Sequence, residues 1–314
     1  MTFGTNNQAG TISTGSVSRL LQDGVNTVFG NALREHDPKW SMMFDSNTSN
    51  KAFEVDVQLE GFTRAFAKSE GDDISFDSRR TGFTPKYVHT TFAKGYIVTK
   101  EALQDELYGQ LDQGARALAR VMNITKEIEG HNIYNNGFDA NFTMIDGDGE
   151  PLFSLTHPNG PSGGTFQNRL TVDADLSEAS LEDMLSLIQN VQDARGLPAA
   201  LMAEKLIVAA GQSSFNAQRI LGSVLQNDTA NNATNAIRDM NSVRDGYMYT
   251  PFLTDPDAWF LKTDAPDGLK YFTRMPVEFG QDNAFTSSNA RFKADERYSF
   301  GWTDPRGAFG SPGA

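Results

Sequence analysis

Hydrophobic residues near the start of the chain recur three and four positions apart. This spacing predicts a helix from Val17 to His36 with Ser16 as its N-cap. Asp37-Pro38 ends the helix, because a residue that precedes proline is pushed out of the helical conformation. The residues that carry the pattern are Leu20, Leu21, Val25, Val28, Phe29 and Leu33. The polar residues 1–13 lack such a period and predict a flexible arm.

A strict alternation of apolar and polar residues follows in residues 53–60 and predicts a β-strand. Its apolar face carries Phe53, Val55, Val57 and Leu59, and its other face carries acids and Gln. A second strand-like piece spans residues 74–76, and further β-type sequence runs over residues 87–99. The simplest interpretation is a long two-stranded ribbon. Because an isolated ribbon is marginally stable, its apolar face either packs on its own domain or needs a partner surface.

The clearest helical pattern begins after Thr99, a good N-cap, and stops at Asn135-Asn136-Gly137. Lys126 and Glu127 fall on its polar side. Its predicted buried stripe is Leu103, Leu107, Leu111, Ala115, Leu118, Met122 and Ile128. Glycines interrupt this long helix at Gly109, Gly114 and Gly130, and they lower its bending stiffness.

The second half of the chain has mixed α and β patterns after a turn-rich connection over residues 137–179. Ser180 and Asp183 are spaced as a capping box at the start of a helix, which Gly196 and Pro198 end. The further predicted elements are a buried strand over residues 206–210, a helix over residues 213–225 and aromatic, β-like sequence over residues 247–309.

Composition narrows the function classes. The chain has 314 residues, so at about 150 residues per domain we expect roughly two domains. With 27 Lys and Arg against 40 Asp and Glu, the net charge of −13 disfavours binding to a nucleic acid duplex. The absence of cysteine excludes disulfides, thiol nucleophiles and Cys-based metal sites. Neither a signal peptide nor an apolar membrane span is expected.

Few motifs suggest chemistry. Asp146-Gly-Asp148-Gly-Glu150 hints at a calcium loop, but an EF-hand needs Gly at its sixth position and Glu at its twelfth, where this chain has Pro151 and His157. A plain turn is therefore expected there. His157 with a nearby acid could serve a hydrolase as a general base, but the GxSxG serine motif is missing. The sequence also contains neither a Walker A loop nor GxGxxG.

Several strings in the C-terminal half carry a resemblance to a known family. They are residues 254–264 (TDPDAWFLKTD), 266–272 (PDGLKYF) and 297–307 (RYSFGWTDPRG), together with the region 180–198 and its ending DARGLP. The chain resembles the tailed-bacteriophage major capsid proteins of the Hong Kong 97-type fold, and within them the Mu-like major head subunits. The resemblance extends over nearly the whole chain.

This resemblance implies an α+β fold of the Hong Kong 97 type and a division of the chain. Residues 1–50 would be an N-terminal arm, residues 51–85 an extended β-hairpin called the E-loop, and residues 86–149 the P domain with its long spine helix. Residues 150–265 would form most of an α/β A domain, and residues 266–314 the return strands of the P domain and the C-terminus.

The resemblance also implies contact residues. Phe62, Arg64, Phe66 and Lys68 of the E-loop would touch neighbouring subunits, and Gly109 and Gly114 would be hinges of the spine helix during shell expansion. Some relatives cross-link subunits through Lys and Asn. Lys68 lies near the ribbon tip, but neither the acceptor Asn nor the promoting Glu has a match here, so this chemistry is not carried over.

The implied function is structural. The chain would assemble as hexamers and pentamers into an icosahedral shell around double-stranded DNA, within a virion assembled in the host cytoplasm. Its partners would be further copies of itself, a portal protein, and scaffold and cement proteins, with no membrane, cofactor, metal or catalytic residue. Two alternatives stay open: an encapsulin-like nanocompartment shell, and a hydrolase that uses His157.

Overall fold

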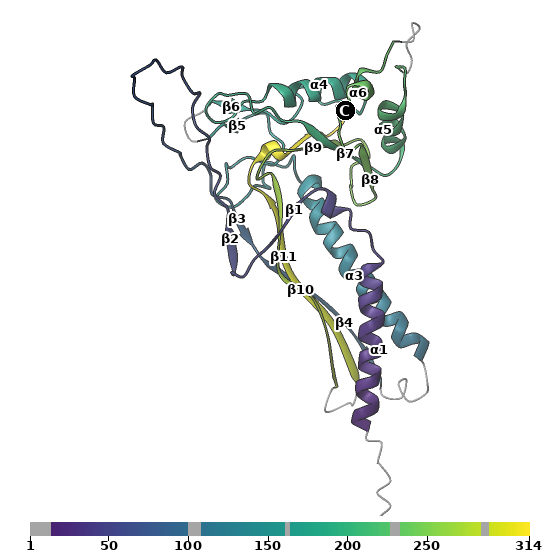
Figure 1. Cartoon of the computed structure of the whole chain (residues 1–314). Coiled ribbons are helices and arrows are strands. Elements are labelled where there is room, and N and C mark those ends of the chain that lie inside the picture. Colours follow the sequence, from purple (N-terminus) through teal and green to yellow (C-terminus); the bar gives the residue numbers. More distant parts are fainter. Residues whose placement is uncertain (1–13, 100–107, 161–163, 227–232, 284–288) are drawn as a thin grey trace, which may run out of the picture. The chain divides into compact units, whose positions relative to one another are not determined.

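A computed structural model describes residues 14–99, 108–160, 164–226, 233–283 and 289–314 (Figure 1). The chain forms two compact units. The first unit consists of Met1–Asp37, Thr91–Thr125 and Pro276–Glu296, and the second consists of Pro38–Thr90, Lys126–Met275 and Arg297–Ala314.

Helices and strands both occur throughout the described chain, and strands predominate towards its C-terminal end. The helices are α1 (Thr14–Arg34), α3 (Tyr108–Asn135), α4 (Glu178–Asn190), α5 (Gln212–Gly222) and α6 (Ala236–Asp239), with the 3-10 helices η1 (Trp40–Met42) and η2 (Pro305–Gly307). The strands are β1 (Asp45–Thr48), β2 (Phe53–Val55), β3 (Lys86–Val88), β4 (Thr90–Val98), β5 (His157–Pro158), β6 (Thr165–Phe166), β7 (Ala203–Ala209), β8 (Tyr247–Thr250), β9 (Trp259–Thr263), β10 (Leu269–Asn283), β11 (Ala290–Trp302) and β12 (Ala308–Ser311).

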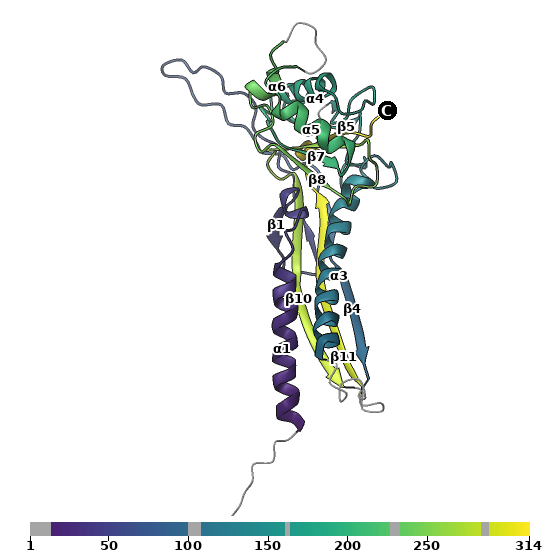
Figure 2. The same ribbon diagram turned by 90° about the vertical axis from the view of Figure 1, so that its right-hand side faces the viewer.

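In the first unit, helices pack on strands. Strand β4 and the adjoining ends of β10 and β11 belong to the sheet with the order β1-β10-β11-β4, and α1 and α3 run beside these strands (Figure 2). The buried core of this unit is Val25, Phe29, Ala115, Leu118, Ala119, Met122, Ala290, Phe292 and Ala294. The predicted N-terminal helix is thus confirmed as α1. Ser16 lies inside α1 and is not its N-cap, because the helix already includes Thr14.

The long predicted helix is confirmed as α3, which ends at Asn135 as expected. Its predicted start after Thr99, with Leu103 and Leu107, lies outside the described residues. Of the predicted stripe, Ala115, Leu118 and Met122 are buried. Together with Val25 and Phe29 of α1, these residues supply the helix side of the first unit's core.

Two residues near the end of α3 exchange their predicted roles. Ile128 is 44% exposed, whereas Glu127, predicted on the polar side, is fully buried. The Glu127 carboxylate accepts the backbone N–H groups of Lys39 at 2.7 Å and Trp40 at 3.1 Å, at the start of η1. A buried carboxylate that satisfies a helix N-terminus is stable, and the hydrophobic pattern alone does not reveal it.

The second unit contains a sheet with the order β12-β9-β7-β8, in which β7 and β8 are parallel and the other neighbours antiparallel. Helices α4, α5 and α6 cover one face, where they share a core with Leu206 and Trp259. On the other face, the Phe260 ring lies 5.1 Å from the rings of both Tyr134 and Phe153. Because both faces are covered, residues 206–209 of β7 are a run of buried apolar residues rather than an alternation.

The predicted elements around this sheet are present with shifted ends. Helix α4 starts earlier than predicted, because Ser177 is its N-cap and forms a capping box with Ser180, whereas Asp183 is not part of the box. The predicted strand over 206–210 is β7, and the predicted helix over 213–225 is α5. The aromatic C-terminal stretch forms β8 to β12, as its pattern predicts.

Candidate assembly surfaces

The ribbon, defined as residues 53–88, projects from the second unit (Figure 2). Strands β2 and β3 pair antiparallel at its root, with Phe53 opposite Val88. Backbone hydrogen bonds continue beyond these strands to the bond from Glu60 N–H to the Arg80 carbonyl at 3.0 Å. The predicted ribbon is therefore confirmed, but its second strand begins later than expected, since residues 74–76 belong to no regular strand.

The apolar face of the ribbon faces solvent. Phe53, Val55, Val57 and Leu59 are each between 40% and 47% exposed. Of the two possibilities that the sequence left open, burial of this face within its own domain is excluded for the chain alone. Exposed apolar side chains in one continuous row are typical of an interaction surface.

The polar face of the ribbon root contacts the body of the second unit. Glu54 accepts hydrogen bonds from Ser49 at 2.7 Å and Lys51 at 3.0 Å, and these bonds lower the pKa of its carboxyl. Further out, Glu60 is 6% exposed and lies 3.5 Å from Arg195. The acids that alternate with the apolar residues are therefore the inward side of this ribbon.

Between these two acids, Asp56 is shared by two partners. Its carboxylate accepts hydrogen bonds from Lys270 at 2.5 Å and from the Thr303 hydroxyl at 2.6 Å. Burial lowers the pKa of Lys270, but its bonds to Asp267 and Asp56 outweigh burial and raise that pKa. The Tyr87 hydroxyl lies 2.8 Å from Thr303, and its burial raises the pKa of the phenol.

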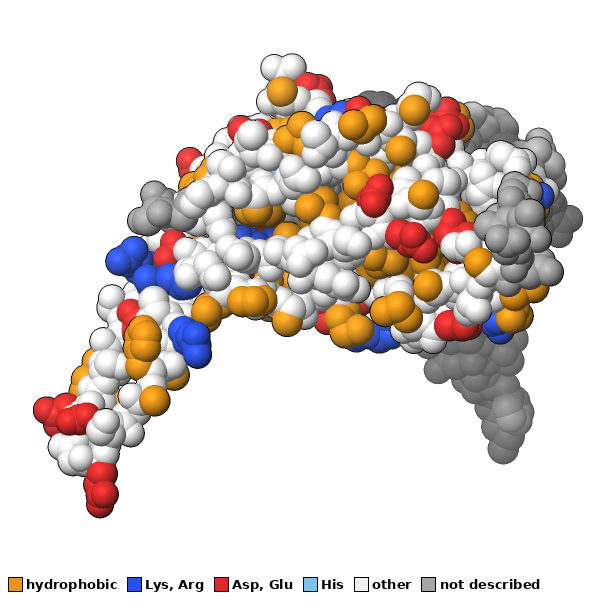
Figure 3. Space-filling view, turned by 90° about the horizontal axis from the view of Figure 1, so that it is seen from above, with side chains coloured by type: hydrophobic (Ala, Val, Ile, Leu, Met, Phe, Trp, Pro, Cys, Tyr) orange, Lys and Arg blue, Asp and Glu red, His pale blue; other side chains and the backbone are white. Residues whose placement is uncertain are grey.

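The outer part of the ribbon is exposed on all sides. Phe62 and Phe66 are 56% and 77% exposed, and Arg64 and Lys68 are exposed with them. All four predicted contact residues thus lie on one accessible segment. Figure 3 shows hydrophobic side chains on the projecting ribbon, with acidic side chains at its end.

Two further exposed apolar residues of the ribbon escaped the sequence analysis. Ile74 and Phe76 are 68% and 93% exposed on the returning segment. The Asp77 carboxylate holds the two segments together, because it accepts the Thr63 backbone N–H and the Thr63 hydroxyl, each at 2.7 Å. These bonds lower the pKa of Asp77. The alternation of apolar residues in 74–76 was the signal that could have identified Ile74 and Phe76.

The proposed hinge glycines lie in α3. A Cβ atom on Gly114 would lie 2.9 Å from two carbons of the Tyr96 ring, so this glycine allows the ring to approach the helix. Gly109 lies within the first turns of α3. Gly114 therefore has a packing reason for lacking a side chain, whether or not the helix bends there.

His157 is fully buried in the turn-rich connection. Its Nδ1 lies 2.6 Å from the Asp148 carboxylate, its Nε2 lies 3.2 Å from the Leu152 carbonyl, and its ring stacks on Phe166. Both ring nitrogens thus face acceptors inside the protein, and the imidazole links two turns. Asp148 belongs to the string predicted to form a plain turn, and this stretch is indeed turn and bend.

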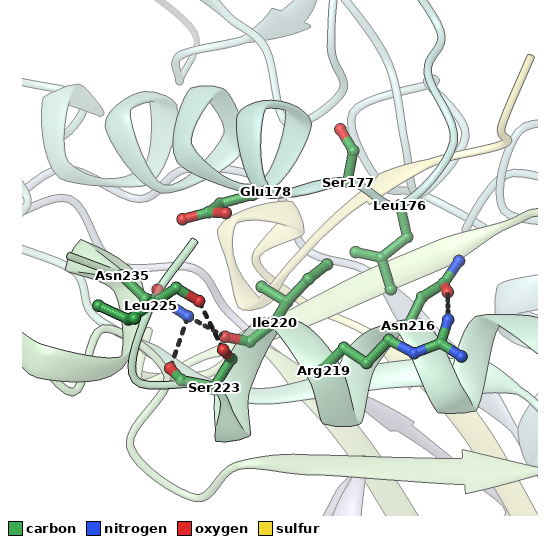
Figure 4. A pocket seen from close by; sticks show the side chains of 9 residues that line it. All are labelled: Leu176, Ser177, Glu178, Asn216, Arg219, Ile220, Ser223, Leu225 and Asn235. Carbon is green, nitrogen blue, oxygen red and sulfur yellow. Dashed lines mark hydrogen bonds between the residues drawn. The ribbon is translucent and has the colours of Figure 1, made fainter. Parts of the chain in front are cut away.

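A cavity of about 270 Å³ lies between the start of α4, helix α5 and the turn before α6 (Figure 4). Most of its polar side chains are used locally. Arg219 donates to Asn216 at 3.2 Å, and the Asn235 amide donates to the carbonyls of Ile220 and Ser223. These bonds connect α5 to its neighbouring turn, so the polar lining serves the fold.

Neither a metal centre nor a membrane-spanning helix is found among the residues that the structure describes. In that part of the chain, no group of three or more His, Asp and Glu side chains could hold a metal ion. The helices described there are all too short or too polar to cross a membrane.

Comparison with known proteins identifies what the chain resembles. A family model described as phage capsid protein matches residues 83–310. A search of curated proteins gives no match.

Similar folds occur among solved structures. The procapsid of bacteriophage JBD30 has 14% identity over 96% of this chain and 76% of that chain, with a TM-score of 0.54. The capsid of an empty GTA particle has 10% identity over 87% and 88%, with a TM-score of 0.53. A virus-like particle from Pyrococcus furiosus has 10% identity over 92% and 98%, with a TM-score of 0.50. At these identities the likeness concerns the fold, and it confirms the predicted α+β architecture.

Proposed function

Because the chain belongs to the phage capsid protein family, we propose that copies of it assemble as hexamers and pentamers into the icosahedral shell around a phage's double-stranded DNA. The protein is a structural major capsid subunit.

One observation supports the proposal most directly. The ribbon exposes its apolar face and buries its acids, so the chain alone leaves hydrophobic area uncovered. Obligate interfaces commonly bury 2,000 Å² or more in total, and a projecting ribbon supplies such area without a larger core. In the proposed shell this face lies on a neighbouring subunit, and Phe62, Arg64, Phe66 and Lys68 contact that neighbour.

The proposed division follows the family's domains. Residues 1–50 act as the N-terminal arm, residues 51–85 as the E-loop and residues 86–149 as the P domain. Residues 150–265 make up most of the A domain, and residues 266–314 return through the P domain to the C-terminus. Within the family, we place the chain nearest to the Mu-like head subunits.

The proposed partners follow from a phage shell. A portal protein replaces one pentamer, scaffold and cement proteins assist assembly, and the DNA is enclosed without sequence-specific contacts, as suits a net charge of −13. Assembly takes place in the host cytoplasm, and the product is part of the virion.

Gly109 and Gly114 are proposed as bending points of the spine helix during shell expansion. Substitution of each by Ala should reduce the fraction of shells that expand. Because the Gly114 variant also disturbs Tyr96, Gly109→Ala is the cleaner test. Normal expansion in Gly109→Ala shells would disprove bending at that position.

Electron microscopy of the purified protein tests the assembly. We expect closed, round particles with hexameric and pentameric units. A stable monomer at every concentration examined would contradict the proposal. An encapsulin-like shell would yield similar particles filled with a cargo enzyme instead of DNA, and the match to a phage capsid model favours the phage shell.

A further inference from the structure

A loop that is distant in sequence lies against the ribbon and contacts it through one side chain. After α4, residues 193–198 form a tight loop, in which the Asp193 carboxylate accepts the backbone N–H groups of Arg195 at 2.8 Å and Leu197 at 2.9 Å. Gly196 completes the loop with a φ of 77°, a left-handed conformation that favours glycine. The loop is thus fixed locally, and it presents Arg195 to the ribbon.

Arg195 contacts both segments of the ribbon. Its Nε lies 3.5 Å from the Glu60 carboxylate on the outgoing segment, and its Nη2 donates to the Ser78 carbonyl on the returning segment at 3.0 Å. The bonds from Thr63 are the main cause of the lowered pKa of Asp77, and the charge of Arg195 adds a smaller contribution after the Ser78 N–H bond. The contact with Glu60 is an ion pair in which Nε forms no hydrogen bond, whereas Nη2 forms the hydrogen bond to Ser78. A guanidinium suits this position because its planar group presents several N–H donors on different sides at once.

The contact between Arg195 and Glu60 is shielded from water. The side chains are 9% and 5% exposed, so screening by salt is weak. Gly160 makes room for Glu60, since a Cβ atom at this position would lie 2.6 Å from the Glu60 Oε1 atom. The loop 193–198 is also hydrogen-bonded to the residue next to Gly160, because the Asn159 amide donates to the Asp193 carbonyl at 2.8 Å.

These contacts lie where regular pairing of the ribbon ends. The bond from Glu60 N–H to the Arg80 carbonyl is the outermost backbone bond between the two segments within the described ribbon, apart from its end turn. Beyond it, the segment that carries Phe62 and Phe66 is exposed, and the bonds from Thr63 to Asp77 join it to the returning segment rather than to the body. A side chain that holds both segments at this point therefore sets the angle at which the exposed segment leaves the body.

We propose that Arg195 is the positioning residue of the ribbon: it anchors both segments to the loop 193–198 and presets the course that the ribbon takes onto a neighbouring copy. This inference rests on the proposed shell function. A preset ribbon loses less conformational entropy when subunits associate, so the anchor lowers the concentration needed for assembly.

The test compares Arg195→Ala, Arg195→Lys and Glu60→Gln with the wild-type full chain. Amide hydrogen exchange of the unassembled subunit reports on the anchor. In Arg195→Ala, exchange at the Gln58, Glu60 and Gly82 amides should be faster by about tenfold, while the β7 amides are unchanged. Lysine retains the charge but not the planar group, so Arg195→Lys should show a smaller increase.

Particle formation reports on the consequence. The critical concentration for assembly should rise by about tenfold in Arg195→Ala, less in Arg195→Lys, and not in the control Arg169→Ala, which removes an ion pair with Asp173 outside the ribbon. Unchanged ribbon exchange in both Arg195→Ala and Glu60→Gln would overturn the anchor. Faster ribbon exchange with unchanged assembly would overturn the positioning role.

Other outcomes are also decisive. If Arg195→Ala loosens β7 as well, Glu60→Gln replaces it, since this variant keeps the side-chain volume and removes only the charge of the partner. A wild-type chain that forms no particles would refute the proposed shell function, whereas its exchange data would still decide whether Arg195 holds the ribbon.

Discussion

At the scale of single residues, the ribbon root depends on acids whose partners lie far away in the sequence. Asp56 meets Lys270 and Thr303, more than two hundred positions later. The sequence predicted that Asp56 and Val57 lie on opposite faces of a strand, but it could not predict which face is inside. That choice depends on partners that only the folded chain brings together.

Asp56 provides a direct test of this network. Asp56→Ala leaves the Thr303 hydroxyl without its carboxylate partner and leaves Lys270 only Asp267, so we expect the free energy of unfolding to fall by about 1 to 3 kcal/mol. Asp56→Asn retains an acceptor for Thr303 and should lose less. Urea denaturation of the unassembled subunit measures both values, and equal stability of Asp56→Ala and wild type would show that the network contributes nothing.

Two buried histidines predict a pH dependence. Burial lowers the pKa of His131, and burial together with Arg297 lowers the pKa of His89. Below the ordinary pKa of 6.5, each histidine is protonated in the unfolded chain but not in the folded chain. The free energy of unfolding therefore decreases as the pH is lowered, until the pH reaches the pKa of the folded state. Each histidine adds a slope of up to about 1.4 kcal/mol per pH unit.

The variants His89→Gln and His131→Gln show how much of this pH dependence each histidine causes. Each should lose its share of the dependence of unfolding free energy on pH between about 6.5 and 5. Urea denaturation at closely spaced pH values measures it. A slope in that range that is the same in wild type and in both variants would assign the pH dependence to other groups.

At the scale of elements, the ends were harder to predict than the elements themselves. Helix α4 was predicted three residues late, because Ser180 and Asp183 fit the capping pattern as well as Ser177 and Ser180 do. In α3 the described part of the predicted stripe, from Ala115 to Met122, is buried, but the carboxylate of Glu127 takes the next buried position. Local spacing predicts a helix face, whereas a polar group with distant partners can override it.

In the outer part of the ribbon, beyond Glu60 and Arg80, the side chain of Asp77 joins the two segments by accepting hydrogen bonds from Thr63. Asp77→Ala removes these hydrogen bonds and should increase trypsin cleavage at Arg64 and Lys68 several-fold, because the two segments then separate more freely. The melting temperature should stay unchanged, since the outer ribbon contributes no core. Asp73→Ala is the matched control, and equal cleavage of both variants would show that Asp77 does not hold the tip.

Glycines in the two long helices should respond oppositely to alanine. A Cβ atom on Gly24 of α1 meets nothing within 4 Å, so Gly24→Ala should stabilise the chain by about 0.5 to 1 kcal/mol through helix propensity. At Gly114 the same change crowds Tyr96, and such overpacking costs about 1 to 3 kcal/mol. Thermal unfolding of the two variants compares them, and stabilisation by both would show that Tyr96 moves aside at no cost.

At the scale of the whole molecule, the sequence predicted α+β content and the resemblance predicted the capsid fold, but no pattern predicted the strand order. β1 pairs with β10 in parallel, with Asp45 opposite Lys270, and β12 returns to β9 in the second unit's sheet. Such pairings join segments far apart in sequence. Periodicity within one segment contains no information about them.

The exposed apolar face of the ribbon should contribute to assembly but little to the stability of the single subunit. A substitution on this face can therefore separate folding from assembly. Val57 lies on that face and is 40% exposed, so Val57→Asp should change the free energy of unfolding by only about 0.5 kcal/mol. In a shell, the same carboxylate would be buried against a neighbour without a partner, at a cost of several kcal/mol for each contact. We therefore expect a folded subunit that forms no particles.

Val172→Asp is the control for this last test, since Val172 is 78% exposed and lies outside the ribbon. Circular dichroism and electron microscopy of both variants, prepared side by side, separate the two effects. Because an added charge at Val172 leaves the ribbon face intact, particles from Val172→Asp together with folded, unassembled Val57→Asp would locate the subunit contact on that face. Normal particles from both variants would mean that the shell leaves the apolar row in water, and the main physical argument for the ribbon as an assembly surface would fail.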